Sequence, residues 1–305
     1  MSKVDCQYNI KSSREFHIKT AKQFGFTLIE LMISLTLGII LSSAVVQVMI
    51  SNNSTERLNR SLASIQENGR FIISRLRNDL IMGGLYDTMS ISTTVATDTI
   101  AEAGFVNNNP VPVKGNFPSP MELKGAKEGG KNLLGKEQSD ILMIVLQADT
   151  DCTGAAHISG GQYIVVNEYF LQSNSLKCRG FDGRKLLSSE YSANTTAYTL
   201  LDNVESFQVL YGVTDNIVST DNSGRPIKFI TAAKLPAEKN AGAVVVAIRI
   251  ALLLKGDSDL TISSGPTLRI LGENVQIDDV SNLYRLFETT ITLRNSKNFV
   301  RSRNI

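Results

Sequence analysis

Few side chains in this sequence are of the types that most often do chemistry: two histidines, three cysteines and some closely spaced aspartates. His157 could act as the base of a serine or cysteine triad. The sequence around it, however, contains no nucleophile-elbow motif, no second histidine and no metal-ligand spacing. We therefore interpret His157 as a loop histidine, and we expect a protein that is not an enzyme and carries no cofactor.

Asp149 and Asp151 lie close together, and carboxylates in a loop can contribute to a calcium site. The acidic residues around them do not have the spacing of a recognised calcium loop. We therefore predict that both aspartates are solvated turn residues and that the protein has no metal site.

The cysteines leave one candidate disulfide. Cys6 lies in a basic N-terminal stretch, whereas Cys152 and Cys178 lie in the body of the chain. If residues 1–25 are removed, Cys152 and Cys178 form the remaining pair, which suits an oxidising compartment. Their bridge would close a loop of about 26 residues and stabilise the fold by roughly 3 kcal/mol. The alternative is two unrelated buried thiols.

Charge is unevenly distributed along the chain. Residues 1–25 contain five basic and two acidic side chains, a net charge of +3, whereas the whole chain has a formal net charge of +2. The difference leaves about −1 for residues 26–305. A body this close to neutral disfavours direct nucleic-acid binding.

Residues 26–50 form an apolar run that contains one charged side chain, Glu30. As a helix that rises about 1.5 Å per residue, the run is long enough to cross the hydrocarbon core of a membrane. The basic residues before it favour a cytoplasmic N-terminus, and the run is longer than that of a secretory signal peptide. Because a carboxylate inside a membrane costs a few kcal/mol, Glu30 either sits at headgroup depth or has a partner.

Helical periodicity continues beyond the apolar run. Leucine and isoleucine recur every three or four positions up to Leu80, with charged residues between them, which is the pattern of an amphipathic helix. Gly69 interrupts this stripe at a cost of about 1 kcal/mol relative to alanine, and Gly83 and Gly84 end it. We predict one helix over 26–83, of which 26–50 spans the membrane.

The remainder, residues 84–305, is predicted to be a β-rich globular head. Residues 84–140 are rich in Gly, Asn, Pro, Ser and Thr and indicate a long, loop-rich connection. Five strand-like runs follow, at 140–147, 162–171, 204–213, 243–255 and 284–294. Short β-branched and aromatic runs separated by turns favour an antiparallel sheet, or two small sheets, packed on the helix. The predicted fold class is α+β.

Residues 22–30, Lys-Gln-Phe-Gly-Phe-Thr-Leu-Ile-Glu, resemble the class III leader junction of type IV prepilins and pseudopilins. The resemblance implies that a prepilin peptidase cuts between Gly25 and Phe26, removes residues 1–25 and methylates the new N-terminus at Phe26. Glycine suits the cut because it lets the backbone enter a tight peptidase cleft. The resemblance also implies an assembly role for Glu30, whose carboxylate would pair with the α-amino group of Phe26 on a neighbouring subunit.

The body resembles the PilW family of minor pilins, in the segments 139–140, 150–154, 176–178, 203–212 and 290–295. This resemblance implies a pilin-like fold, in which a long N-terminal helix packs on an antiparallel β-rich domain. It further implies a minor pilin that takes part in assembly and priming at the pilus tip, supporting twitching motility and adhesion.

The same resemblance implies partners and a location. The partners would be the prepilin peptidase, other minor pilins and the major pilin through the N-terminal helix, and a tip adhesin. The chain would cross the inner membrane once, with its head in the periplasm, and would reach the pilus and the cell surface on assembly. Two alternatives stay open: a minor pseudopilin of a type II secretion system, and a membrane-anchored enzyme or binding domain with an uncut anchor.

Overall fold

The structure is a computed structural model of the 305-residue chain. It describes residues 25–86, 105–106, 108–113, 139–157, 161–188, 196–214, 225–256, 265, 267–277, 279 and 281–296. The chain divides into two compact units, Met1–Thr55 and Glu56–Ile305. The expected leader up to residue 24, and most of the loop-rich connection expected over 84–140, lie outside the described residues.

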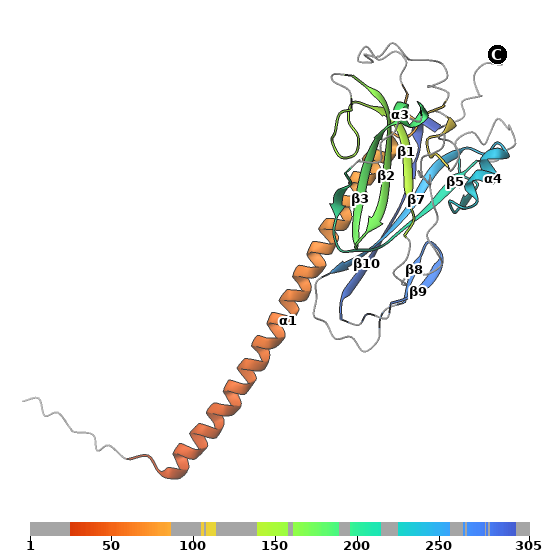
Figure 1. Ribbon diagram of the computed structural model, residues 1–305. Helices are drawn as coiled ribbons and strands as arrows, with labels where there is room; N and C mark the ends of the chain where they lie inside the picture. The colour runs from red at the N-terminus through yellow and green to blue at the C-terminus, as the bar shows by residue number, and fades with distance from the viewer. Residues whose placement is uncertain are drawn as a thin grey trace, which may run out of the picture. The chain divides into compact units, whose positions relative to one another are not determined.

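Helix α1 (Leu28–Ile81) is the longest element and contributes to both units (Figure 1). Thr27 caps its first turn, because Thr27 Oγ1 accepts a hydrogen bond from the Glu30 amide at 3.3 Å. The helix ends at the predicted glycines, where Gly84 has a φ of 74° that a residue without a side chain adopts at little cost.

The head contains two four-stranded antiparallel sheets (Figure 1). The first has the order β1-β2-β3-β4 and consists of β1 (Leu142–Ala148), β2 (Tyr163–Gln172), β3 (Ser175–Asp182) and β4 (Tyr198–Leu201). A two-residue turn joins β2 to β3, and both of its residues, Ser173 and Asn174, have positive φ. This turn geometry matches the natural twist of paired strands. Helix α3 (Gly183–Ser188) follows β3.

The second sheet has the order β10-β7-β5-β6 and consists of β5 (Val204–Val213), β6 (Lys228–Ile230), β7 (Val245–Gly256) and β10 (Leu283–Thr292). Helix α4 (Leu235–Asn240) connects β6 to β7, and the 3-10 helix η1 (Arg294–Ser296) follows β10. Strands β8 (Thr267–Ile270) and β9 (Glu273–Gln276) form a separate two-stranded sheet. The five strand-like runs of the sequence correspond to β1, β2, β5, β7 and β10.

The main hydrophobic core lies between the head portion of α1 and one face of each sheet. Helix α1 contributes Ile65, Ile72, Leu76 and Leu80 to it. The opposite face of the first sheet is also covered, because Met143 and other residues of that face form a second cluster with α3. Burial on both faces explains why β1 has an unbroken apolar sequence instead of an alternating one.

The predicted α+β class is confirmed, with a long N-terminal helix and antiparallel sheets. One detail of the prediction is wrong: Gly69 does not interrupt the buried stripe of α1 but belongs to it, together with Ile65 and Ile72. A Cβ added at Gly69 would overlap the ring of Phe287 in β10. Glycine therefore lets the helix approach the second sheet closely at this point.

Candidate processing and assembly site

The predicted cleavage junction lies immediately before α1. Gly25 and Phe26 are outside the helix, and Phe26 is 83% exposed. In the described part of the chain, no atom lies within 4 Å of the position that a Gly25 Cβ would occupy. The peptide bond between the two residues is therefore accessible to an enzyme.

Glu30 lies in the first turn of α1, where a carboxylate interacts favourably with the helix dipole. Its carbonyl oxygen accepts a hydrogen bond from Ser34 Oγ at 2.8 Å. The residue is exposed, and its carboxylate has no hydrogen-bond or ion-pair partner among the described residues. The geometry leaves this carboxylate free to interact with a group of another molecule.

The N-terminal half of α1 has an apolar surface. Its large hydrophobic residues from Leu28 to Ile50 are 53–79% exposed. Among the described helices, α1 is the one that is long and apolar enough to cross a membrane. One face of this segment combines Ser34, Gly38 and Ser42 with larger apolar residues, and small residues allow neighbouring helices to approach closely.

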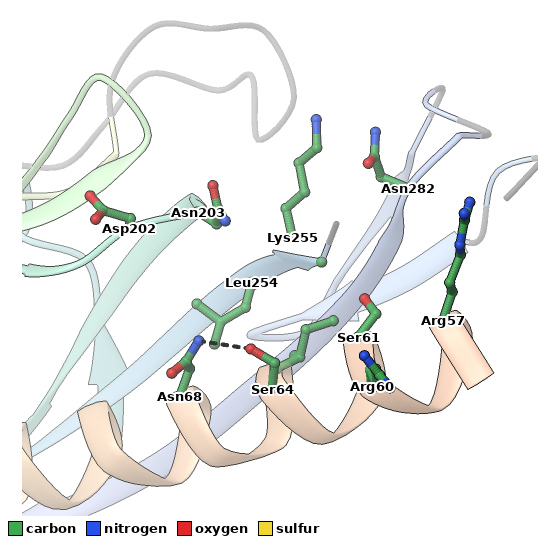
Figure 2. A pocket seen from close by; sticks show the side chains of 12 residues that line it. Arg57, Arg60, Ser61, Ser64, Asn68, Asp202, Asn203, Leu254, Lys255 and Asn282 are labelled. Carbon is green, nitrogen blue, oxygen red and sulfur yellow. Dashed lines mark hydrogen bonds between the residues drawn. The ribbon is translucent and has the colours of Figure 1, made fainter. Parts of the chain in front are cut away.

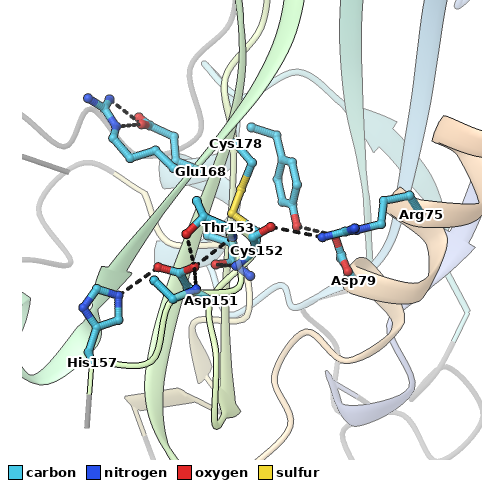
Figure 3. The surroundings of a disulfide bond; sticks show 12 residues. Arg75, Asp79, Asp151, Cys152, Thr153, His157, Glu168 and Cys178 are labelled. Carbon is cyan, nitrogen blue, oxygen red and sulfur yellow. Dashed lines mark hydrogen bonds and ion pairs between the residues drawn. A yellow bond between two sulfur atoms is a disulfide. The ribbon is translucent and has the colours of Figure 1, made fainter. Parts of the chain in front are cut away.

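Cys152 and Cys178 are joined by a disulfide in the head (Figure 3), with 6.3 Å between their Cα atoms. Cys178 lies in β3, Cys152 lies in the loop after β1, and both are buried. The bridge therefore fastens this loop to the first sheet. The third cysteine, Cys6, lies outside the described residues.

Two family models match the chain. The model of the type IV pilus-assembly protein W family, PilW, matches residues 162–295, which include β2 to β10. The model of the prokaryotic N-terminal methylation motif matches residues 20–46, which include Gly25, Phe26 and Glu30. The two matches together support a PilW-type type IV pilin.

A solved structure, the type IV-like pilin TTHA1219 from Thermus thermophilus, is similar to this PilW-family chain at 15% sequence identity. The similarity covers 52% of this chain and 80% of the other, with a TM-score of 0.30. A comparison with curated proteins finds no match. The matches support a membrane-anchored, PilW-type pilin in pilus assembly, and pilins are structural proteins.

Asp151 in the PilW head is buried, so the prediction that it is a solvated turn residue is wrong; Asp149 is exposed, as predicted. Asp151 Oδ1 accepts hydrogen bonds from the amides of Thr153 and Ala155 at 2.8 and 3.2 Å and from the Thr153 hydroxyl at 2.5 Å. These contacts shape the disulfide-bonded loop (Figure 3). No group of three or more metal-ligating side chains is placed to hold an ion in the portion of the head that the structure describes.

His157 lies in this same loop, as predicted, and its Nε2 is 2.8 Å from Asp151 Oδ2. Its ring packs edge-on against Tyr163 at a centroid distance of 5.6 Å. A histidine–aspartate pair is also found in hydrolase triads. Within the described residues, no hydroxyl or thiol forms a hydrogen bond to the His157 ring. The pair joins two residues of the disulfide-bonded loop.

Three residues that join α1 to the loop and to the first sheet were missed by the sequence analysis: Arg75 and Asp79 of α1, and Tyr169 of β2. Arg75 donates a hydrogen bond to the Cys152 carbonyl oxygen at 3.0 Å, and Asp79 accepts one from the Tyr169 hydroxyl at 2.9 Å (Figure 3). Burial raises the pKa of Asp79, although Tyr169 and Arg75 oppose this effect. The one signal in the sequence was the four-residue spacing of Arg75 and Asp79 beside the apolar stripe.

Proposed function

We propose that this PilW-family pilin is a minor pilin that primes type IV pilus assembly at the pilus tip and so supports twitching motility and adhesion. The observation that carries the proposal is the exposed apolar segment of α1, with Glu30 as its single charged residue up to Ile50. Such a surface needs lipid or other apolar helices around it. During assembly, this segment would leave the lipid and pack against the apolar helices of other subunits.

This exchange gives little net hydrophobic gain, because lipid tails are as apolar as leucine. Helices in apolar surroundings associate through close packing and through interactions between polar groups. In this chain, Ser34, Gly38 and Ser42 provide small side chains for close packing. Glu30 provides the polar group.

We propose that Glu30 pairs with the α-amino group of Phe26 on a neighbouring subunit, after cleavage between Gly25 and Phe26. An unpaired charge costs about 2.5–3.5 kcal/mol at the centre of a membrane helix on insertion scales, and Glu30, in the first turn of α1, would incur at most this cost in apolar surroundings. Pairing with an ammonium group offsets this penalty and sets the axial stagger between helices. N-methylation of Phe26 retains the positive charge that the pair needs.

Charge and redox chemistry support the proposed topology. The basic residues before Phe26 favour a cytoplasmic N-terminus, which would put the head in the periplasm. The Cys152–Cys178 bridge suits an oxidising compartment of this kind. Other minor pilins and the major pilin would then bind through α1, and a tip adhesin would bind the head.

Gly25→Val tests the cleavage site. In cells with an active prepilin peptidase, the variant should keep the electrophoretic mobility of the precursor seen in a peptidase-deficient strain. Gly38→Val is the matched control, because an added Cβ at either glycine meets no atom within 4 Å among the described residues; this control should be cut normally. Normal maturation of Gly25→Val, or a mature N-terminus other than Phe26, would refute the site.

Glu30→Gln and Glu30→Val test the pairing. Both variants should be processed, but the amount recovered in sheared pili should fall about tenfold or more, as expected if more than 1.4 kcal/mol of pairing energy is lost. Glu67→Gln removes an exposed carboxylate from the same helix and should be incorporated normally. Equal incorporation of all variants would exclude the pairing role.

Immunogold labelling of sheared pili tests the tip position, and the label should be found at filament ends. A deletion strain should have fewer pili and reduced twitching and adhesion. Label spread along the whole filament would contradict the tip position, and normal piliation of the deletion strain would contradict priming.

A further inference from the structure

A groove of about 470 Å³ lies in the head, between α1 and the ends of several strands (Figure 2). Helix α1 contributes Arg57, Arg60 and Ser61 to its lining, and the strand side contributes Asn203, Lys255 and Asn282. In Figure 2, Arg57, Lys255 and Asn282 extend their polar ends to the same side. The groove is therefore rich in hydrogen-bond donors, and three of these are cations.

The cations of this groove are weakly compensated. Arg57 is exposed and has no ion-pair partner among the described residues. Arg60 pairs with Glu56, but the two side chains are 79% and 57% exposed, and exposed pairs contribute little. Lys255 Nζ lies 3.5 Å from Asp279 Oδ2, again at a partly exposed position.

One acidic residue, Asp202, lines the groove. Its Oδ1 accepts a hydrogen bond from Ser175 Oγ at 2.7 Å. The described lining therefore has three positive charges and one negative charge, and two of the cations pair with Glu56 and Asp279 beside the lining. Arg57 remains without an ion-pair partner among the described residues, which favours an anionic ligand.

Ser61 gives an independent indication of a ligand. The residue is only 8% exposed, and its buried Oγ has no hydrogen-bond partner in the described structure. A buried hydroxyl without a partner costs about 1–3 kcal/mol, and an anionic oxygen in the groove would accept its hydrogen bond. Beside it, Ile65 and Leu254 are 3% and 2% exposed and form an apolar floor.

We propose that this groove binds a phosphate group, carried either by the headgroup of a membrane lipid or by a free phosphate ester. Guanidinium groups such as those of Arg57 and Arg60 match the geometry of phosphate oxygens. Lys255 adds a third charge and Ser61 a neutral donor. The apolar floor suits the carbon atoms of the ester and disfavours a purely inorganic ion.

The position of the groove in the chain places it within reach of lipid headgroups. Arg57 follows Ile50, the end of the apolar run, by seven residues. Seven residues span at most about 25 Å in any conformation. If the periplasmic leaflet also carries anionic lipids, basic residues near its surface are attracted to it in the same way as at the cytoplasmic leaflet, by about 1 kcal/mol for each residue.

The test uses the full-length protein in a phosphate-free, non-ionic detergent, with binding measured by native mass spectrometry and isothermal titration calorimetry. The probes are dihexanoyl phosphatidylglycerol, glycerol 3-phosphate, inorganic phosphate and, as a neutral analogue, dihexanoylglycerol. Arg57→Gln/Lys255→Gln should weaken lipid binding about 30-fold, since each cation contributes about fivefold. Arg70→Gln/Arg77→Gln is the matched control, because it removes two exposed arginines of α1 outside the groove.

Ser61→Ala should weaken binding of the same probe about tenfold through loss of one hydrogen bond to a charged group, with the circular dichroism of the head unchanged. Binding of both phosphatidylglycerol and glycerol 3-phosphate supports a general phosphate-ester site, and binding of the lipid alone supports a headgroup site. The proposal is overturned if no phosphate probe binds, if dihexanoylglycerol binds equally well, or if the control variant loses as much affinity. Binding of duplex DNA in place of the phosphate probes would also overturn it.

Discussion

Replacing Gly69 by alanine tests how closely α1 is packed against the second sheet. At an exposed helix position this change would stabilise the protein by about 1 kcal/mol, because alanine has the higher helix propensity. At Gly69 the added methyl group overlaps the Phe287 ring, and overpacking of this kind costs about 1–3 kcal/mol. We expect the net free energy of unfolding to fall by up to about 2 kcal/mol.

A double-mutant cycle with Phe287→Leu isolates the contact. Leucine alone in place of the ring removes carbon atoms packed against the core and should cost about 1–3 kcal/mol. It also makes room for the alanine methyl group, so the double variant should be more stable than the sum of the single effects by at least about 1 kcal/mol. Ser74→Ala, at an exposed position of the same helix, is the matched control and should not lower stability.

Unfolding of the head in urea can be followed by far-ultraviolet circular dichroism and by tyrosine fluorescence, since the chain has eight tyrosines and no tryptophan. The free energy of unfolding is then obtained by linear extrapolation. Additivity within about 0.5 kcal/mol would mean that residues 69 and 287 are not in contact. A Gly69→Ala variant as stable as Ser74→Ala would likewise refute the reasoning.

Three further predictions concern the head. The double variant Cys152→Ser/Cys178→Ser should lower the free energy of unfolding of the head by about 3.5 kcal/mol, because the lost bridge has a sequence separation of 26. Cys6→Ser is the control and should have no effect. Two reactive thiols in the mature wild-type protein would contradict the bridge. Asp151→Asn should lower the free energy of unfolding by about 1.5–3 kcal/mol, because it weakens charge-assisted hydrogen bonds, and should speed proteolysis of the loop. An equal effect of Asp149→Asn, at an exposed position, would contradict this prediction. Burial lowers the pKa of Lys239 from 10.5 to about 8. Above pH 8 the lysine is therefore protonated in the unfolded chain but largely neutral in the folded protein. The free energy of unfolding should then rise with pH, by at most about 1.4 kcal/mol per pH unit between pH 8 and 9.5. Lys239→Met should reduce this slope and exposed Lys234→Met should not; the same slope in both would exclude Lys239 as its source.

The sequence predicts those elements whose apolar pattern is complete within one segment. Helix α1 has its three- and four-residue periodicity, and β5 has the predicted bounds, 204–213, because each pattern is local. Strand β3 was not predicted as a strand, although Lys177 and Arg179 alternate with its buried residues as in a half-buried strand. Its Lys, Gly and Asp residues are depleted in strands. Strand β4 has only four residues, of which two are exposed and two are partly buried. Pairing with neighbouring strands, not local composition, makes these segments strands.

The cleavage motif could likewise be predicted from the sequence, whereas the contacts around the disulfide-bonded loop could not. The Gly25–Phe26 junction and Glu30 form a continuous motif next to an apolar run, so they are visible in the sequence without a fold. The contact of Arg75 with the Cys152 carbonyl joins α1 to a loop 77 residues later. No local pattern encodes a contact of this kind, because it depends on how the helix packs against the first sheet.

Asp151 combines one property that can be predicted from the sequence with one that cannot. Its hydrogen bonds to Thr153 and Ala155 are a local turn of the kind that aspartate commonly forms, so the turn itself was predictable. Its burial was not, because it depends on Gly180 in β3, where an added Cβ would overlap the Asp151 carboxylate. A distant glycine therefore determines whether this carboxylate is solvated or buried, and Gly180→Ala should displace the loop even though every residue of the turn is unchanged.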